Sequence, residues 1–297
     1  MREKKKKSSD TEIVSTFNQC RIHFLFRPEE AVKEAWKNRV TCSICFLKNF
    51  FHDRNIILPD VNFNVYVLSN FSETKAILFE RSQGNFHLQL GAAAAVVKGA
   101  LYSQQNSEPF MDVHEFVHIL IDKLTKNESD GKFWIPMWFS EGLAQYIQGK
   151  KMGIDYLNWA RESKNLPNPF LKNMNWPTEK SWLEFGVMKE LVKTNNHPGL
   201  TACASLVAFL SEKEKIPFYR IMNLIFSRNF NDFYLNLEKI SRLTIFDLFN
   251  NYLYYIDKPM ITKGVDKISL PVSVGTDFRE EFIFEEKEFE LAKELLS

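Results

Sequence analysis

Two histidines separated by three residues, His114 and His118, place the strongest constraint on what this chain can fold into. Both imidazoles can reach one point only on a helix, because residues four apart lie on the same helical face. The apolar residues around them follow helical spacing and predict a mostly buried helix over 109–125: Val113, Phe116, Val117, Leu120, Ile121 and Leu124. Two imidazoles suit Zn²⁺, which in hydrolases keeps one coordination position open for water.

Two glutamates complete the expected site. Glu115 projects to one side of the histidine pair, where its carboxylate can accept a proton from a zinc-activated water as the catalytic general base. A catalytic zinc needs a third protein ligand, and Glu141 follows His118 by 23 residues on the next predicted helix. Gly142 would let the two helices approach closely. The pattern therefore predicts one Zn²⁺ per chain, held by His114, His118 and Glu141.

The residues before the predicted helix over 109–125, the metal helix, follow a pattern that mixes strands with helices. Apolar residues, helical or alternating spacing and turn residues predict the following elements: a short strand over 21–26, a long helix from about 29 to 51, a strand over 61–67, a short helix capped by Asn70, a strand over 86–90, and a hairpin of 93–97 with 100–103 turning at Lys98-Gly99. After the metal helix, the expected elements are a helix over 138–148 ended by Gly149, a linker over 165–177, and helices over 181–194, 200–213, 217–226, 230–241 and 244–257.

This order indicates an α+β fold. We expect an N-terminal mixed α/β lobe with a small antiparallel or mixed sheet, then a mainly α-helical lobe, with the zinc site at their junction. The predicted segments are a flexible basic tail over 1–12, the α/β lobe over 13–108, the helical lobe over 109–258 and an acidic C-terminal extension over 259–297.

Charge and hydropathy restrict the partners. The net charge of the 297 residues is +1, so no global field points to nucleic acid. Residues 2–7 hold five bases and one acid, a local +4, and residues 277–294 hold eight acids and three bases, a local −5. The basic head is read as a solvated terminus, with a nucleic-acid or membrane arm as the alternative. No apolar run follows it and none reaches about 18 residues, so we expect no transmembrane segment and a cytoplasmic protein.

The four cysteines do not make a disulfide framework in a chain of this length. Cys42 and Cys45 form a lone Cys-x-x-Cys within a helical pattern, and we predict that both are small buried hydrophobic residues. Reduced thiols would fit the cytoplasm.

His-Glu-x-x-His followed by Trp-x-Ser-Glu-Gly-x-Ala-x-Tyr, at 138–146, resembles the gluzincin metallopeptidases, the peptidase MA-like group related to thermolysin and the zinc aminopeptidases. The similarity extends from about Val61 to Tyr255. It implies that His114, His118 and Glu141 bind zinc, and that Glu115 acts as the base and then passes the proton to the leaving amine. It also implies that the strand over 100–103 runs along the cleft and pairs with an extended peptide through free backbone groups.

The sequence departs from this family at two positions. Gln145 stands where relatives often carry an acid that orients a zinc histidine; its carbonyl can still accept the imidazole N–H, but without charge. Leu200 stands where relatives place a Tyr or His that stabilises the oxyanion, so Tyr146, Tyr156 or the zinc alone would take that role.

We therefore expect a zinc-dependent metallohydrolase, a peptidase that acts on a peptide or protein substrate. The alternative is a catalytically inactive zinc-bound relative that binds peptides or a partner protein, favoured by Gln145 and Leu200. Two further readings stay open: a chance motif whose histidines are simply packed, and a binding protein that uses its basic head on nucleic acid, a partner that we do not otherwise expect.

Overall fold

The computed structural model describes residues 11–15, 20–58, 61–70, 72–74, 76–77, 94–97, 99–107, 111–125, 135–162 and 198–256. The described residues fall into two compact units, one within 11–125 and one within 135–256. Helices outnumber strands in them, and one five-stranded sheet lies in the first unit, so the α+β class is confirmed. The lobe boundaries expected from the sequence stay predictions.

The sheet is mixed. Its strands are β1 (Thr11–Ser15), β2 (Cys20–Phe24), β3 (Phe63–Leu68), β4 (Ala94–Val97) and β5 (Ala100–Gln104), arranged in the order β1-β2-β3-β5-β4. The inner strands β2, β3 and β5 run parallel, while β1 and β4 pair antiparallel at the two edges. The alternation predicted around Val65 is observed, because Val65 and Val67 are fully buried on one face. Strand β1 was not predicted.

The expected hairpin before the metal helix is confirmed, with Gly99 in its turn at a φ of +67°. One consequence drawn from it is wrong, however. Strand β5 pairs with β3 on one side and with β4 on the other, so the backbone groups of 100–103 are not free to bind a peptide. The parallel pairing with β3 was invisible in the sequence, and the edge strand of the described sheet is β4.

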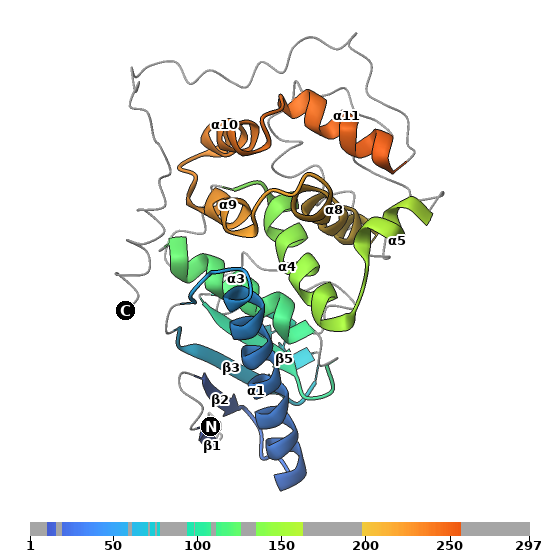
Figure 1. Ribbon diagram of the computed structural model, residues 1–297. Helices are drawn as coiled ribbons and strands as arrows, with labels where there is room; N and C mark the ends of the chain where they lie inside the picture. The colour runs from blue at the N-terminus through green and yellow to red at the C-terminus, as the bar shows by residue number, and fades with distance from the viewer. Residues whose placement is uncertain are drawn as a thin grey trace. The chain divides into compact units, whose positions relative to one another are not determined.

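Two helices cover one face of this sheet. Helix α1 (Glu30–His52) connects the parallel strands β2 and β3, and α3 (Met111–Thr125) follows β5 (Figure 1). The ring of Phe116 on α3 lies 4.8 Å from that of Phe63 on β3, centroid to centroid. Helix α1 buries Trp36, Leu47 and their neighbours against the same layer.

The cysteine pair on α1 corrects the sequence-based expectation. Cys42 is exposed and Cys45 is half-buried, so they are not buried hydrophobic residues. Trp36, Val40 and Leu47 lie on the buried face of the helix, and the helical spacing places both cysteines away from that face.

The second unit is helical. It contains α4 (Met137–Met152), α5 (Tyr156–Glu162), α8 (Pro198–Ala208), a π-helical turn (Phe209–Lys213), α9 (Phe218–Asn223), a 3₁₀ turn (Leu224–Phe226), α10 (Phe230–Ser241) and α11 (Ile245–Tyr255). The predicted helices after residue 200 are confirmed, and α5 was not predicted. The expected strand over 86–90, linker over 165–177, helix over 181–194 and extension over 259–297 lie outside the described residues.

Helix α4 differs from its prediction at two glycines. It runs through Gly149 and ends at Gly153, which has a φ of +71° and caps the helix in the left-handed conformation. A Cβ on Gly142 would lie 2.7 Å from the carbonyl oxygen of Cys203, so the close approach expected at Gly142 is made to α8. None of the helices described is long and apolar enough to cross a membrane.

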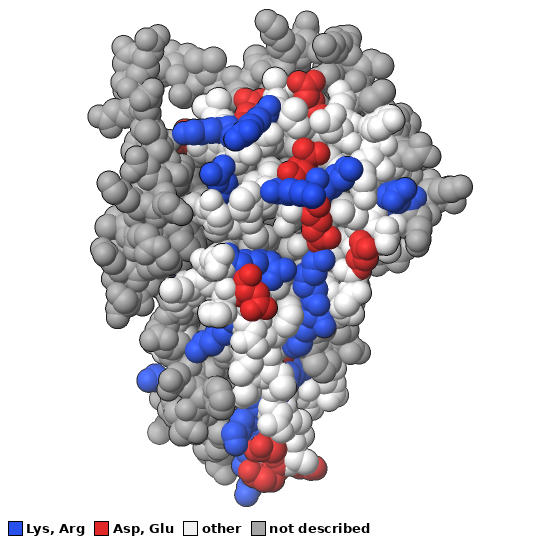
Figure 2. Space-filling view, in the orientation of Figure 1, with Lys and Arg blue, Asp and Glu red and all other residues white. Residues whose placement is uncertain are grey.

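Basic and acidic side chains are interspersed over the described part of the face in Figure 2. Ion pairs join some of them, including Lys33 with Glu30 and Lys150 with Glu212, each at 2.7 Å. Ion pairs that are exposed or partly exposed contribute roughly 0–1 kcal/mol each, so these pairs add little to the stability of the fold.

Candidate metal centre

The two motif histidines lie one turn apart on α3, as the spacing predicts. Their Nε2 atoms are 3.1 Å apart, with ring centroids at 4.8 Å and ring planes at 72°. At this distance one nitrogen donates a hydrogen bond to the other, according to the tautomers. The helix thus directs the same ring nitrogen of His114 and His118 to one point.

Helix α3 is accessible at one of these histidines. From Asp112 to Ile121 every residue is buried except His118, which is half-buried. His114 and Glu115 are 6% and 8% exposed, respectively. Burying polar side chains in a helix of apolar residues is unfavourable unless they bind a partner. Their presence at this point makes this face of α3 a candidate binding site.

An ion pair between α1 and α3 holds the first turn of the metal helix. The Arg39 guanidinium donates from Nε to one carboxylate oxygen of Asp112 and from Nη2 to the other, at 2.6 Å for the second bond. Arg39 also donates to the backbone oxygen and hydroxyl of Ser107 at 2.6 and 2.9 Å. Asp112 is fully buried and lies near the positive end of the helix dipole. This network orients α3 two residues before His114.

Neither Arg39 nor Asp112 was predicted as part of the site. An acid in the first turn of a helix is common, and an arginine on an amphipathic helix normally reaches solvent. The one available signal was Asp112, two residues before the motif on the predicted buried helix.

Glu141 lies on the partly exposed face of α4. Between Trp138 and Gly149 every residue is buried except Glu141 and Gln145, which are half-buried and one helical turn apart. The neighbouring helix α8 supplies Cys203, whose pKa is raised by burial and also by the charge of the Glu141 carboxylate.

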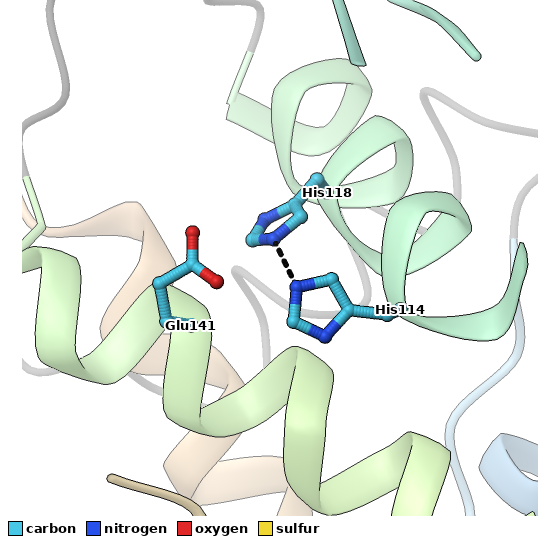
Figure 3. Close-up of side chains that lie close together, drawn as sticks. All are labelled: His114, His118 and Glu141. Carbon is cyan, nitrogen blue, oxygen red and sulfur yellow. Dashed lines mark hydrogen bonds between the residues drawn. The ribbon is translucent and has the colours of Figure 1, made fainter. Parts of the chain in front are cut away.

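The ligand atoms of His114, His118 and Glu141 all lie within 4.8 Å of one another, and the Glu141 carboxylate faces the two imidazoles (Figure 3). Zinc binds imidazole nitrogen at about 2.0–2.1 Å, and a tetrahedral angle then separates two such nitrogens by about 3.3 Å. The observed Nε2 separation of 3.1 Å is close to this value. Two histidines and one carboxylate therefore fit a divalent metal ion of intermediate hardness. The same set of donors binds zinc in hydrolases and iron(II) in oxygenases.

The other residues named from the sequence have partners within the second unit. The Tyr146 hydroxyl donates to Glu212 Oε1 at 2.9 Å, and Tyr156 is hydrogen-bonded to Gln145. Leu200 lies in α8. The oxyanion role considered for Tyr146 and Tyr156 and the imidazole-orienting role of Gln145 stay predictions.

Comparison with protein-family models, with curated proteins and with solved structures gives no match to this chain. The gluzincin resemblance therefore rests on the residues of the two motifs, and the chemistry has to be argued from the site itself.

Proposed function

We propose that this chain is a zinc-dependent metallohydrolase of the gluzincin type that cleaves peptide bonds. The observation that supports it is the convergence of His114, His118 and Glu141, whose ligand atoms lie within 4.8 Å of one another. A zinc ion held by these residues would polarise the scissile carbonyl and lower the pKa of the attacking water.

Glu115 is the proposed general base. It lies between the two histidines in sequence, on the flank of the face that carries them, and is 8% exposed. Its carboxylate accepts a proton from the attacking water and transfers it to the leaving amine.

The substrate proposed is an extended peptide or a protein segment. Strand β4 lies at the edge of the described sheet and contacts α3, the helix that carries the histidines. An edge strand leaves a row of backbone donors and acceptors with which an extended peptide can pair. Peptide binding by strand addition is therefore assigned to β4, in place of β5.

The second candidate is an inactive relative that binds zinc and a peptide or partner protein. It is favoured by the hydrogen bonds of the two tyrosines considered for the oxyanion, since Tyr146 donates to Glu212 and Tyr156 to the Gln145 backbone. Gln145 also lacks the charge by which an acid would raise the basicity of a zinc histidine.

Substitution Glu115→Gln tests the proposal, because it keeps the shape of the side chain and removes its basicity. Wild-type protein is expected to cleave members of a random peptide library, with cleavage stopped by a chelator and restored by zinc. Glu115→Gln is expected to bind zinc but to cleave about 10²–10⁴-fold more slowly. The exposed residue Glu34, changed to Gln in the same way, is the control and should leave the rate unchanged.

Cleavage at the wild-type rate by Glu115→Gln would remove Glu115 from the base role. Zinc binding by the wild type without turnover of any peptide in the library would instead support the inactive binding protein.

A further inference from the structure

Helix α1 presents two thiols on a face away from its buried residues. The buried face carries Trp36, Val40 and Leu47, which are 1–2% exposed. Cys42 is exposed and Cys45 is half-buried, and both are free thiols. Residues three apart on a helix lie about 60° apart around its axis, so the two side chains leave the helix on one face. The Cys-x-x-Cys motif is therefore a pair of accessible thiols.

The helix geometry favours a bound ion over a disulfide between these thiols. Cβ atoms three residues apart on a helix are about 5–6 Å apart, whereas a disulfide requires about 3.5–4.5 Å. Closing that bond would deform α1, which is continuous from Glu30 to His52. A metal–thiolate bond is about 2.3 Å long, so two thiolates on opposite sides of one ion have their sulfurs about 4.6 Å apart. Rotation about χ1 brings the two sulfurs to this separation without moving the backbone.

The surroundings of the thiol pair determine which ion it fits. Asn38 and Asn49, one turn before and one turn after the pair, are exposed neutral amides. Within the described ranges, the potential ligands that converge in a group of three are His114, His118 and Glu141, so the thiol pair gains no third ligand of this kind there. Zinc requires four ligands, which in structural sites are cysteines and histidines. Copper(I) is a soft ion that two thiolates satisfy, and it fits the pair better.

We propose that Cys42 and Cys45 form a binding site for one copper(I) ion. Each thiol releases its proton to solvent on binding, each sulfur forms one bond to the ion, and the copper keeps its oxidation state. Because both residues belong to the same helix, their spacing is fixed before the ion arrives and no loop has to be ordered. The site shares no residue with the proposed zinc centre, so the inference does not rest on the proposed function.

The test is the copper(I) affinity of the reduced full chain, measured without oxygen by competition with a chelator. The ultraviolet absorption of the copper–thiolate bond is the second readout, because it reports binding by sulfur alone. The wild type is expected to show this absorption and to bind about one copper(I) ion per chain through sulfur. Cys42→Ser and Cys45→Ser each remove one of two linked donors and should weaken binding about 10²–10⁴-fold. His118→Ala should leave the absorption unchanged, since it alters only the proposed zinc centre.

Cys45→Ser combined with Asn49→Cys is the matched control. It keeps two accessible thiols and the charge of the helix, but places the thiols about 10.5 Å apart along the axis, too far for one ion. It should bind copper(I) as weakly as Cys45→Ser alone. Wild-type affinity in this control or in Cys42→Ser, or a wild type without copper–thiolate absorption, would overturn the inference.

Size-exclusion chromatography with and without copper(I) tests whether one chain supplies both thiols. We expect the elution volume to stay the same. Dimerisation caused by copper(I) would show that each chain supplies one thiol to a shared ion, and it would overturn the inference. None of these outcomes depends on whether the chain binds zinc, so the proposed function and this inference can fail separately.

Discussion

Gly142 lies one residue after the proposed ligand Glu141 and sets how closely α4 approaches α8. An added methyl group would lie 2.7 Å from the Cys203 carbonyl oxygen and 2.8 Å from its carbon, both backbone atoms that cannot rotate away. We expect Gly142→Ala to lower the free energy of unfolding by about 1–3 kcal/mol, because the two helices must separate. Urea denaturation measures this change.

Gly153 offers the matched comparison for this prediction. It has a φ of +71° and no atom within 4 Å of an added Cβ, so Gly153→Ala meets backbone strain of about 1–2 kcal/mol without a collision. Only Gly142→Ala should also weaken zinc binding, since only Gly142 adjoins Glu141. Full stability in Gly142→Ala would show that the α4–α8 contact is looser than described.

At the scale of single elements, α3 depends on a buried ion pair for its position. The side chains of Arg39 and Asp112 are 9% and 0% exposed. Removing Asp112 leaves the Arg39 charge buried without its counter-charge and with only the hydrogen bonds to Ser107, and breaking a buried ion pair in this way typically costs about 3–5 kcal/mol. We therefore expect Asp112→Ala to lower the free energy of unfolding by about this amount, measured by urea denaturation at neutral pH.

The exposed pair of Lys33 with Glu30 is the control, and Lys33→Ala should change the stability by less than about 1 kcal/mol. An equally small effect of Asp112→Ala would contradict the anchoring role assigned to the Arg39–Asp112 pair.

Elements with a clear apolar period were predictable from the sequence. The helix around His114, the hairpin closed by Gly99 and helix α10 were expected from spacing and turn residues, and the structure contains them. The Asn70 cap is also observed, since its Oδ1 accepts the N–H of Glu73 at 3.0 Å.

Features that depend on tertiary partners were not predictable. Gly149 resembled a helix end, but it is glycine because the Tyr156 ring occupies the place of a Cβ. Strand β5 resembled an edge, but its pairing with β3 joins segments far apart in the chain. The site followed the same rule: local spacing predicted the histidine pair, whereas the contacts of Asp112 and Tyr156 required the fold.

At the scale of the whole molecule, buried ionisable groups make stability depend on alkaline pH. Burial, with a smaller effect of Asp112, raises the pKa of the Cys20 thiol from 9.0 to about 12, and burial also raises that of Cys203. Well below pH 9 both thiols are protonated whether the chain is folded or not. Above it, the unfolded chain releases these protons first, so the free energy of unfolding should fall as the pH rises from 9 towards 12.

Chemical denaturation at a series of pH values measures this slope. Cys20→Ala should make it shallower, whereas Cys42→Ala, at an exposed position, should leave it unchanged. A slope identical in Cys20→Ala and the wild type would show that the Cys20 thiol ionises alike in both states.

Zinc titration of the purified chain tests whether His114, His118 and Glu141 form a metal centre. We expect about one zinc ion per wild-type chain, bound more tightly than iron(II), and much weaker binding by Glu141→Ala and His118→Ala. A wild type that binds no zinc after chelation and reconstitution, or an affinity unaffected by either substitution, would contradict it and leave the two histidines as packed residues of a helix.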